Sequence, residues 1–218
     1  MTKVLFVDDD IDLCTAFQSY LGKKGLDVTV AHNGKVAHKM VYETKPDLII
    51  LDIQMGNTDG FQLATKLRKE GCIIPIIFFS GLQDSQFVVK GFDLGADDYI
   101  KKPVDPEELY ARIKSKIKDE FILGEYAFNS NTCELRYKNG AITTLTLIQS
   151  QILKCLCRNI GKTLSRESIF LTIWGTDTAT SRTIDSHISK IRKCFHENSG
   201  VEIIRDYASG YRLVIKQV

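Results

Sequence analysis

In the first half of the chain, side chains that can do chemistry stand at the ends of short apolar runs. Asp8 and Asp9 follow the run KVLFV, Asp52 follows DLIIL, Ser80 ends PIIFFS and Lys102 ends DYIKK. Carboxylates that lie close together repel one another unless a cation sits between them, and carboxylate oxygens suit Mg²⁺. A carboxylate can also attack phosphorus to form an acyl phosphate, while an ammonium neutralises charge on the transferred group. These residue types therefore indicate phosphoryl transfer onto an aspartate.

The apolar runs alternate with amphipathic segments in a regular way. Short runs of Val, Ile, Leu and Phe are typical of strands buried on both faces, and the segments between them have the apolar spacing of helices. Five such strand–helix units predict an α/β fold with a doubly wound, five-stranded parallel sheet. Ligands of such sheets bind outside the carboxyl ends of the strands, so we expect the polar residues to meet there. The expected strands are 3–7, 27–31, 47–52, 75–80 and 98–102.

Within that expected site, Asp52 is our candidate phosphoryl acceptor, and Asp8 and Asp9 join it as candidate Mg²⁺ ligands. Two alternatives stay open. Aspartates after a strand can instead form the acidic first turn of a helix, which is the favoured explanation for Asp10. The second alternative is an enzyme with an aspartyl nucleophile. Haloacid-dehalogenase-like enzymes, however, need an acid two residues after the nucleophile, where this chain has Gln54.

Residues 1–118 resemble the receiver domain of two-component response regulators, which has a flavodoxin/CheY-like fold. The resemblance implies that a sensor histidine kinase phosphorylates Asp52. It also implies that Ser80, Tyr99 and Lys102 respond to the phosphate, and that a homodimer then forms on the face of the fourth helix, fifth strand and fifth helix. The matching site residues are Asp8, Asp9, Asp52, Ser80, Tyr99 and Lys102-Pro103. The dimer-face residues that it implies are Asp93, Asp97, Glu108, Arg112 and Lys114.

Three positions of this half depart from the family's usual pattern. Gly56 stands where proline is common, and Val104 stands where phenylalanine is common. Val88 stands where a basic residue usually partners Glu108. These departures leave open a third alternative, in which the receiver is vestigial and DNA binding does not depend on phosphorylation. The complete set of site residues argues against it.

The second half of the chain has short strands first, then helices, then a hairpin. EYAFNS, CELRYKN and AITTLT alternate in the manner of antiparallel strands. Thr146 and Ser165 are expected N-caps of two helices, and RTIDSHISKIRKCF is expected to form a third with a core stripe of isoleucines. The opposite face of this third helix is basic and rich in hydroxyls, which suits the major groove of DNA. A merely solvated charged face is an equally weighted alternative.

Residues 124–218 resemble the α+β winged-helix DNA-binding domain of OmpR/PhoB-type regulators. The matching motifs are LT at 145–146, WG at 174–175, RTIDSHISKIRK at 182–193 and GYRL at 210–213. The resemblance implies promoter DNA with direct repeats as the target, and RNA polymerase as a partner of the polar loop before the third helix. Its usual wing arginine is absent here, because Tyr207 stands at that position. The expected DNA-contacting residues are Arg182, Thr183, His187, Lys190, Arg192, Lys193, Tyr207 and Arg212.

The composition is that of a globular protein, with 218 residues, 44% hydrophobic and 26% charged. No apolar run approaches the roughly 20 residues of a membrane span, and the N-terminus enters a strand at once, so we expect a cytoplasmic protein without membrane contact. The six cysteines lack metal or disulfide spacing and are expected to be reduced. Basic and acidic residues number 16 and 17 in 1–118, and 13 and 10 in 119–218. The expected organisation is a receiver at 1–118, a linker at 119–123 and a winged helix at 124–218.

Overall fold

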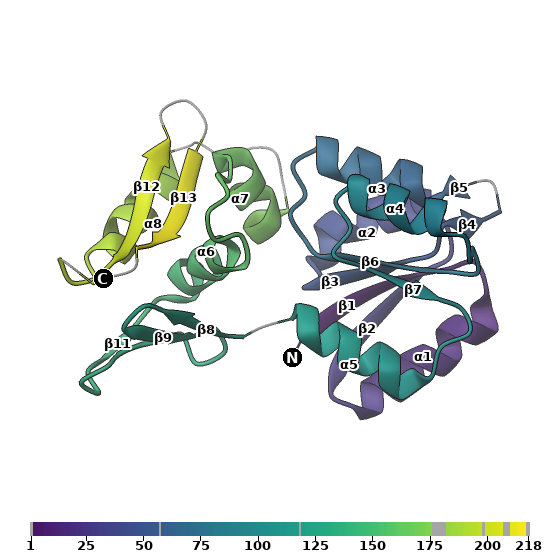
Figure 1. Ribbon diagram of the computed structural model, residues 1–218, viewed down its shortest axis with the longest axis horizontal. Helices are drawn as coiled ribbons and strands as arrows, with labels where there is room; N and C mark the ends of the chain where they lie inside the picture. The colour runs from purple at the N-terminus through teal and green to yellow at the C-terminus, as the bar shows by residue number, and fades with distance from the viewer. Residues whose placement is uncertain are drawn as a thin grey trace. The chain divides into compact units, whose positions relative to one another are not determined.

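The computed structural model describes residues 2–56, 58–117, 119–175, 182–197, 199–206 and 210–216. The chain forms two compact units, Met1–Ile117 and Lys118–Val218 (Figure 1). Each unit has its own sheet and its own helices, so we describe each by itself. No helix in the described part of the chain combines the length and the apolar character needed to cross a membrane.

The first unit is a five-stranded parallel sheet between two layers of helices, as the sequence predicts. The strands are β1 (Thr2–Val7), β2 (Leu26–Ala31), β3 (Leu48–Leu51), β6 (Ile76–Ser80) and β7 (Asp98–Lys101), and their order is β2-β1-β3-β6-β7. The helices are α1 (Ile11–Lys23), α2 (Gly34–Thr44), α3 (Gly60–Lys69), α4 (Ser85–Asp93) and α5 (Pro106–Lys116). Figure 1 shows α1 and α5 on one face of the sheet and α2, α3 and α4 on the other.

Successive strand residues enter two separate cores because their side chains alternate between the faces of the sheet. Val4 and Phe6 of β1 pack with the buried residues of α1 and α5, whereas Leu5 and Val7 pack with those of α2 and α3. All four are fully buried. This double burial explains why the strands appear in the sequence as continuous apolar runs rather than alternating ones.

Two local features of this unit differ from expectation. Asp10 is not in the first turn of α1 but is its N-cap, since its Oδ1 accepts the Leu13 N–H at 2.9 Å. The segment after Asp52 carries a small hairpin of β4 (Gln54–Met55) and β5 (Thr58–Asp59), which no sequence pattern indicates. Gly56 follows β4 with a φ of 49°, a backbone conformation that glycine adopts more readily than proline or other residues.

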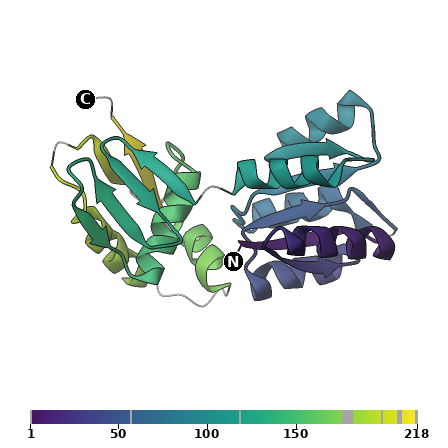
Figure 2. The same cartoon turned by 90° about the horizontal axis from the view of Figure 1, so that it is seen from below.

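The second unit opens with an antiparallel sheet and closes with a hairpin (Figure 2). The sheet has the order β11-β10-β9-β8, from β8 (Glu120–Leu123), β9 (Tyr126–Asn129), β10 (Glu134–Tyr137) and β11 (Ile142–Thr144). Three helices follow: α6 (Leu147–Arg158), α7 (Arg166–Trp174) and α8 (Arg182–Arg192). The hairpin consists of β12 (Val201–Asp206) and β13 (Gly210–Ile215). The strand–helix–hairpin order agrees with the winged-helix expectation.

The boundaries of two elements correct the sequence-based expectation. Residues 120–123 form strand β8, which pairs with β9 across four residues, so most of the expected linker belongs to the sheet. Its alternating burial, with Phe121 and Leu123 inward, is that of a half-buried strand. The third helix ends at Arg192 rather than at 195, where the expected segment RTIDSHISKIRKCF ends. Thr146 is the N-cap of α6, as expected, and it forms a capping box with Gln149.

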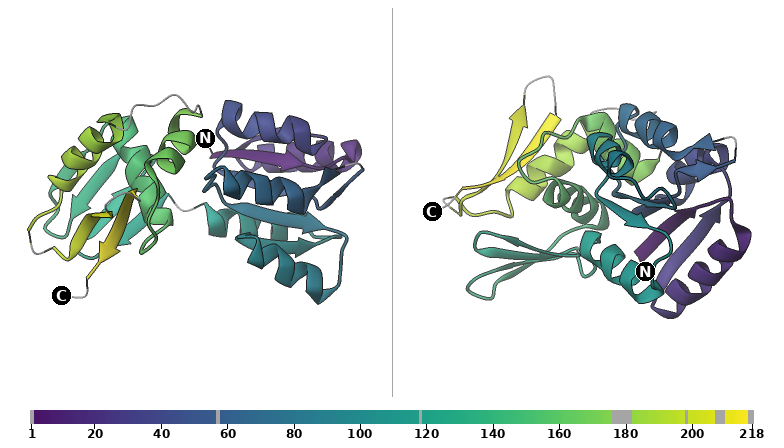
Figure 3. Two further views of the ribbon diagram at one scale, coloured as in Figure 1. Left: turned by 90° about the horizontal axis from the view of Figure 1, so that it is seen from above. Right: turned by 45° about the vertical axis from the view of Figure 1, so that its right-hand side comes forward.

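The hairpin is anchored on the rest of the second unit by a close backbone contact. Leu164 and Tyr211 exchange both backbone hydrogen bonds, at 2.8 and 2.9 Å. Gly210 precedes this contact with a φ of 133°, and a Cβ added there would lie 1.9 Å from Leu164 O. Only glycine allows this approach. Figure 3 shows the hairpin beside α6, α7 and α8 within this unit.

Candidate functional site

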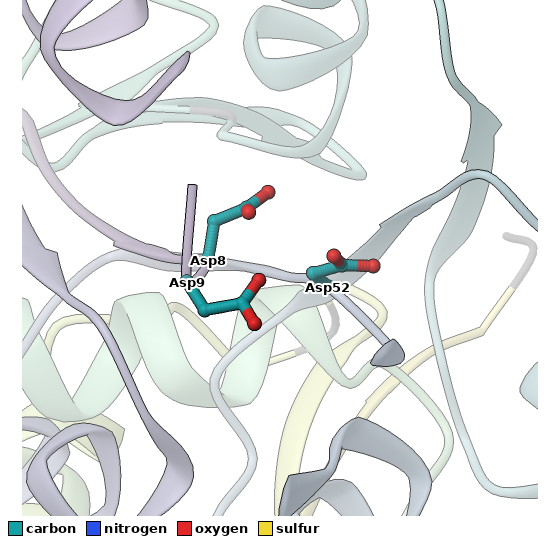
Figure 4. Close-up of side chains that lie close together, drawn as sticks. All are labelled: Asp8, Asp9 and Asp52. Atoms are coloured by element: carbon teal, nitrogen blue, oxygen red, sulfur yellow. The ribbon is translucent and has the colours of Figure 1, made fainter. Parts of the chain in front are cut away.

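Three carboxylates gather at the carboxyl edge of the parallel sheet (Figure 4). Asp8 and Asp9 come directly after β1, and Asp52 comes directly after β3. Each offers an oxygen within 4.8 Å of those offered by the other two. Asp8 is fully buried and Asp52 is 5% exposed, whereas Asp9 is exposed. The structure therefore brings the three predicted metal ligands together, with one side of the cluster open to solvent.

Lys102, directly after β7, places an ammonium beside the two buried carboxylates. Its Nζ donates to Asp8 Oδ2 at 2.7 Å and to Asp52 Oδ2 at 2.9 Å. Burial lowers the pKa of Lys102, but its hydrogen bonds to the two carboxylates outweigh burial and raise the pKa above its usual value. Burial likewise raises the pKa of Asp8, and the hydrogen bond from Lys102 only partly opposes this. The half-buried ammonium thus partly offsets the cost of burying the Asp8 carboxylate.

The cluster fits a hard divalent cation. Its potential ligands are all carboxylate oxygens, the donors that Mg²⁺ prefers, and one ammonium does not offset three ionised carboxylates. Because Asp9 is exposed, an ion beside it would keep water ligands on its solvent side, as Mg²⁺ usually does. The residues present are therefore suited to Mg²⁺.

Backbone N–H groups and Lys102 together orient Asp52. Its Oδ1 accepts the N–H of Ile53 at 2.6 Å and that of Gln54 at 3.3 Å, while Oδ2 accepts Lys102. Both carboxylate oxygens are thus fixed, one by the neighbouring backbone and the other by Lys102. A carboxylate held at the edge of an acidic, cation-binding site is placed for nucleophilic attack on phosphorus.

Ser80 and Tyr99 contact the same short segment beside the cluster. Ser80 ends β6 and is fully buried, and its Oγ accepts the Leu82 N–H at 3.4 Å. Tyr99 on β7 is 8% exposed, and its hydroxyl donates to Leu82 O at 3.0 Å. The backbone of Leu82 therefore contacts both side chains.

Gln83 makes a hydrogen bond near the site that sequence patterns do not indicate. Its Nε2 donates to Lys102 O at 2.7 Å and so ties the segment after β6 to the Lys102-Pro103 peptide, which is cis. The two residues are 19 positions apart, and an exposed glutamine in a loop has no distinguishing pattern. Only the folded sheet, with β6 beside β7, brings them together.

The expected dimer-face residues lie on or near α4, β7 and α5, and three of them, Glu108, Arg112 and Asp97, are already paired within the chain. Arg112 lies 2.8 Å from Glu108 and 3.4 Å from Asp98. Asp97 lies 3.5 Å from Arg68. These contacts would compete with pairs formed across a dimer. Asp93, Asp97, Glu108 and Lys114 are exposed, and Arg112 is half-buried.

In the second unit, α8 presents a polar face backed by a buried one. Ile184, Ile188 and Ile191 are buried, while Thr183, Ser186, Ser189 and Lys190 are exposed. His187 lies at the margin, half-buried, and its Nδ1 has no hydrogen-bond partner among the described residues. Burial and then the charge of Lys190 lower the pKa of His187. Both effects disfavour the charged form of the His187 imidazole.

The remaining expected DNA contacts differ in availability. Arg192 Nε donates to Ile203 O at 2.8 Å, so part of this guanidinium joins α8 to β12. Arg212 lies 3.4 Å from Asp206 across the hairpin, and Lys193 is exposed. The Arg182 side chain and Tyr207 lie outside the described residues, as do residues 176–181, most of the loop expected to contact RNA polymerase.

Comparisons with known proteins match both halves of the chain. Residues 4–114 match the response regulator receiver domain family, and residues 140–213 match the family "Transcriptional regulatory protein, C terminal". The transcriptional regulatory protein RprY of Bacteroides fragilis is 32% identical, over 97% of this chain and 94% of that protein. The alkaline phosphatase synthesis transcriptional regulatory protein PhoP of Bacillus subtilis is 30% identical, over 90% of this chain and 89% of that protein.

The receiver half also has a similar solved structure. It is the BeF3-activated N-terminal receiver domain of RstA from Klebsiella pneumoniae, which is 35% identical with a TM-score of 0.50. The match covers 52% of this chain and 97% of that structure.

Proposed function

The chain belongs to the response regulators that join a receiver domain to a C-terminal transcriptional regulatory domain, and we propose that Asp52 is the residue whose phosphorylation controls it. As a member of this family it is a phosphorylation-dependent, DNA-binding regulator of transcription. The observation that carries the assignment is the convergence of Asp8, Asp9, Asp52 and Lys102 at one sheet edge. The relatives are transcriptional regulators, so we propose a phosphoryl acceptor rather than a phosphatase or phosphotransferase enzyme.

In the proposed reaction, a carboxylate oxygen of Asp52 attacks the phosphorus of a phosphohistidine on a sensor kinase. The P–N bond breaks, an acyl phosphate forms, and the histidine leaves with a proton from solvent. Asp8, Asp9 and Asp52 would hold Mg²⁺, which when bound neutralises charge on the transferred group. Lys102 neutralises the same charge from the protein side, because its ammonium already lies at Asp52.

We further propose that Ser80 and Tyr99 carry the signal away from Asp52. A phosphoryl oxygen accepting a hydrogen bond from Ser80 would draw its hydroxyl away from the Leu82 N–H. Leu82 O of the same segment accepts a hydrogen bond from the Tyr99 hydroxyl, and the Tyr99 ring packs against α4 at Gly91. This geometry supports a two-state face of α4, β7 and α5 on which a second copy binds. The proposed contacts across it include Asp93, Asp97, Glu108, Arg112 and Lys114.

For the second unit we propose that α8 lies in the major groove of promoter DNA. Lys190 and Thr183 are exposed on its polar face and are the proposed contacts to base edges or phosphates. Lys193, Arg192 and Arg212 are proposed phosphate contacts. A dimer of such units suits direct repeats, and RNA polymerase is a proposed partner of the loop before α8.

Intact-protein mass spectrometry tests the phosphoacceptor. The full chain is incubated with Mg²⁺ and acetyl phosphate, beside Asp52→Asn and the matched variant Asp10→Asn. Asp10 is an acid near the same edge whose capping role asparagine retains. We expect one added phosphoryl group in the parent and in Asp10→Asn, and none in Asp52→Asn. Equal modification of all three proteins would assign the acceptor elsewhere, and no modification with small donor or kinase would indicate a vestigial receiver.

A further inference from the structure

Asp185 is the single acid on the polar side of α8, and it is the centre of a cluster that joins four elements of the second unit. Its Oδ1 accepts Arg166 Nε of α7 at 2.9 Å and the hydroxyl of Tyr211 of β13 at 2.6 Å. Its Oδ2 lies 3.6 Å from the guanidinium of Arg205 on β12. One carboxylate thus connects α7, α8 and both strands of the hairpin. From the sequence, Asp185 stands out only as an acid among basic residues.

The tyrosine of this cluster is also bound by cation–π contacts. The guanidinium of Arg166 lies 5.0 Å from the centre of the Tyr211 ring, and that of Arg192 lies 5.7 Å from it. Arg192 is seven residues after Asp185, two helical turns along the same side of α8, and it holds Ile203 O of β12. The side of α8 that carries Asp185 and Arg192 is therefore fixed against the hairpin at two points.

The arginines of the cluster differ in exposure. The side chain of Arg166 is 15% exposed, whereas that of Arg205 is 50% exposed. Asp185 Oδ1 already accepts two short hydrogen bonds, and the 3.6 Å separation to Arg205 is an ion pair rather than a hydrogen bond. The carboxylate therefore holds the Arg205 guanidinium beside α8 by charge while leaving half of the side chain open to solvent.

We propose that Arg205 binds a DNA phosphate beside the groove that α8 enters, and that Asp185 is the positioning residue that holds it there. This inference rests on the proposed DNA-binding role of α8. Among the described residues of the cluster, one carboxylate lies among three guanidiniums, and this excess of positive charge at the junction of helix and hairpin supports the proposal. Arginine suits a phosphate contact because its donors match two phosphate oxygens at once. No sequence motif assigns this role to position 205.

The test measures the salt dependence of DNA binding by the full-length protein. A short fluorescently labelled duplex is titrated with parent, Arg205→Gln and the control Arg136→Gln over a range of salt concentrations. Arg136 lies on β10, is 58% exposed and has an acid 4.0 Å away, so the charge change and exposure are matched outside the cluster. For Arg205→Gln we expect about tenfold weaker binding and a log–log salt slope smaller by about 0.9, as for one lost phosphate contact. Arg136→Gln should retain the parent slope.

The variant Asp185→Asn distinguishes positioning of Arg205 by Asp185 from simple repulsion between the Asp185 carboxylate and DNA. Removing a carboxylate near DNA would strengthen binding if simple repulsion decided the outcome. If Asp185 positions Arg205, binding weakens instead, and the slope falls as it does in Arg205→Gln. The double variant should then bind no more weakly than Arg205→Gln, apart from any effect on folding that thermal unfolding reports separately.

Three outcomes would overturn the inference. An unchanged salt slope in Arg205→Gln would show that Arg205 makes no phosphate contact. Tighter DNA binding by Asp185→Asn, or strictly additive effects of the two substitutions in the double variant, would show that Asp185 does not position Arg205. A parent protein without salt-dependent binding, phosphorylated or not, overturns the proposed function itself. Parent binding that persists with the slope unchanged in both variants overturns this inference alone.

Discussion

Lys102 Nζ lies 2.7 Å from Asp8 Oδ2, and this bond joins a fully buried carboxylate at the end of β1 to the loop after β7. Asp8 has a raised pKa because burial disfavours its charge, and Lys102 is the cation that lies against it. The ammonium approaches from the protein side, whereas Asp9 faces solvent. This arrangement supports the proposed division of charge, in which Lys102 supplies a cation from the protein side and Mg²⁺ would bind from the solvent side at Asp9.

Replacing Lys102 by methionine should destabilise the first unit and increase its response to Mg²⁺. The variant leaves two buried carboxylates without their cation, which in comparable sites costs on the order of 3 kcal/mol. Mg²⁺ would then supply the missing charge, so the rise in unfolding temperature on adding Mg²⁺ should exceed that of the parent. Thermal unfolding followed by circular dichroism, with and without Mg²⁺, measures both effects.

Lys101→Met is the control for this prediction. Lys101 is adjacent and exposed, and the structure records no ion pair for it within the described residues. Its replacement should change neither stability nor the Mg²⁺ response by a comparable amount. A Mg²⁺ response of Lys102→Met equal to that of the parent would contradict the proposed division of charge.

Gly91 permits α4 to lie against the rings of Phe78 and Tyr99, so Gly91→Ala should lower the free energy of unfolding. A Cβ at this position would lie 3.1 Å from Phe78 and 3.2 Å from Tyr99. Overpacking of a buried site costs about 1–3 kcal/mol, which exceeds the gain of up to about 1 kcal/mol from alanine's helix propensity. The control is Gly22→Ala in α1, where a Cβ meets nothing within 4 Å and stability should rise. Urea unfolding gives the free energy of unfolding of both variants. An equal increase in the two variants would contradict the tight contact at Gly91.

Gly210→Ala should destabilise the second unit by more than about 2 kcal/mol. The added Cβ would lie 1.9 Å from Leu164 O, so the backbone contact that anchors the hairpin must open. Gly140→Ala is the matched control, because that glycine also has a positive φ, 90°, but has open space around it. Trp174 is the single tryptophan and lies in this unit, so its fluorescence follows the unfolding. If Gly210→Ala loses no more stability than Gly140→Ala, the loss comes from strain in φ and not from the contact with Leu164 O.

The parallel sheet and the carboxylate cluster at its edge could be predicted because their determinants are local. Runs such as KVLFV and DLIIL are buried on both faces, and the residue after each run necessarily lies at the carboxyl edge. Five polar side chains at four strand ends therefore specify the site without coordinates. The same logic fails after Asp52, where the β4–β5 hairpin depends on backbone pairing of only two residues on each side.

Other features could not be predicted because they join distant parts of the chain. The strand character of 120–123 depends on pairing with β9, and its four residues are too short to distinguish a strand from a linker. Arg192 looks like a phosphate contact from its place on α8, but its bond to Ile203 O appears only once the hairpin is folded. Asp185 is similar, since its partners Arg166 and Tyr211 lie 19 and 26 positions away.

Asp119 makes the stability of the second unit dependent on pH in the acid range. Burial raises its pKa, but the hydrogen bond from Lys154 at 2.9 Å and the charge of that lysine lower it more, so the folded pKa is below the ordinary value. A carboxyl whose pKa is depressed by folding contributes stability above its unfolded pKa, near 4, and loses that contribution as pH falls through the folded value. Asp119→Asn should therefore be less stable than the parent by a constant amount between about pH 5 and pH 7, and the difference should shrink below about pH 4. Urea unfolding followed by Trp174 fluorescence measures this difference in stability. As the control, Asp119→Asn should have little effect on stability in a protein that already carries Lys154→Met. A difference that persists at low pH would show that the asparagine acts through packing rather than through the lost charge.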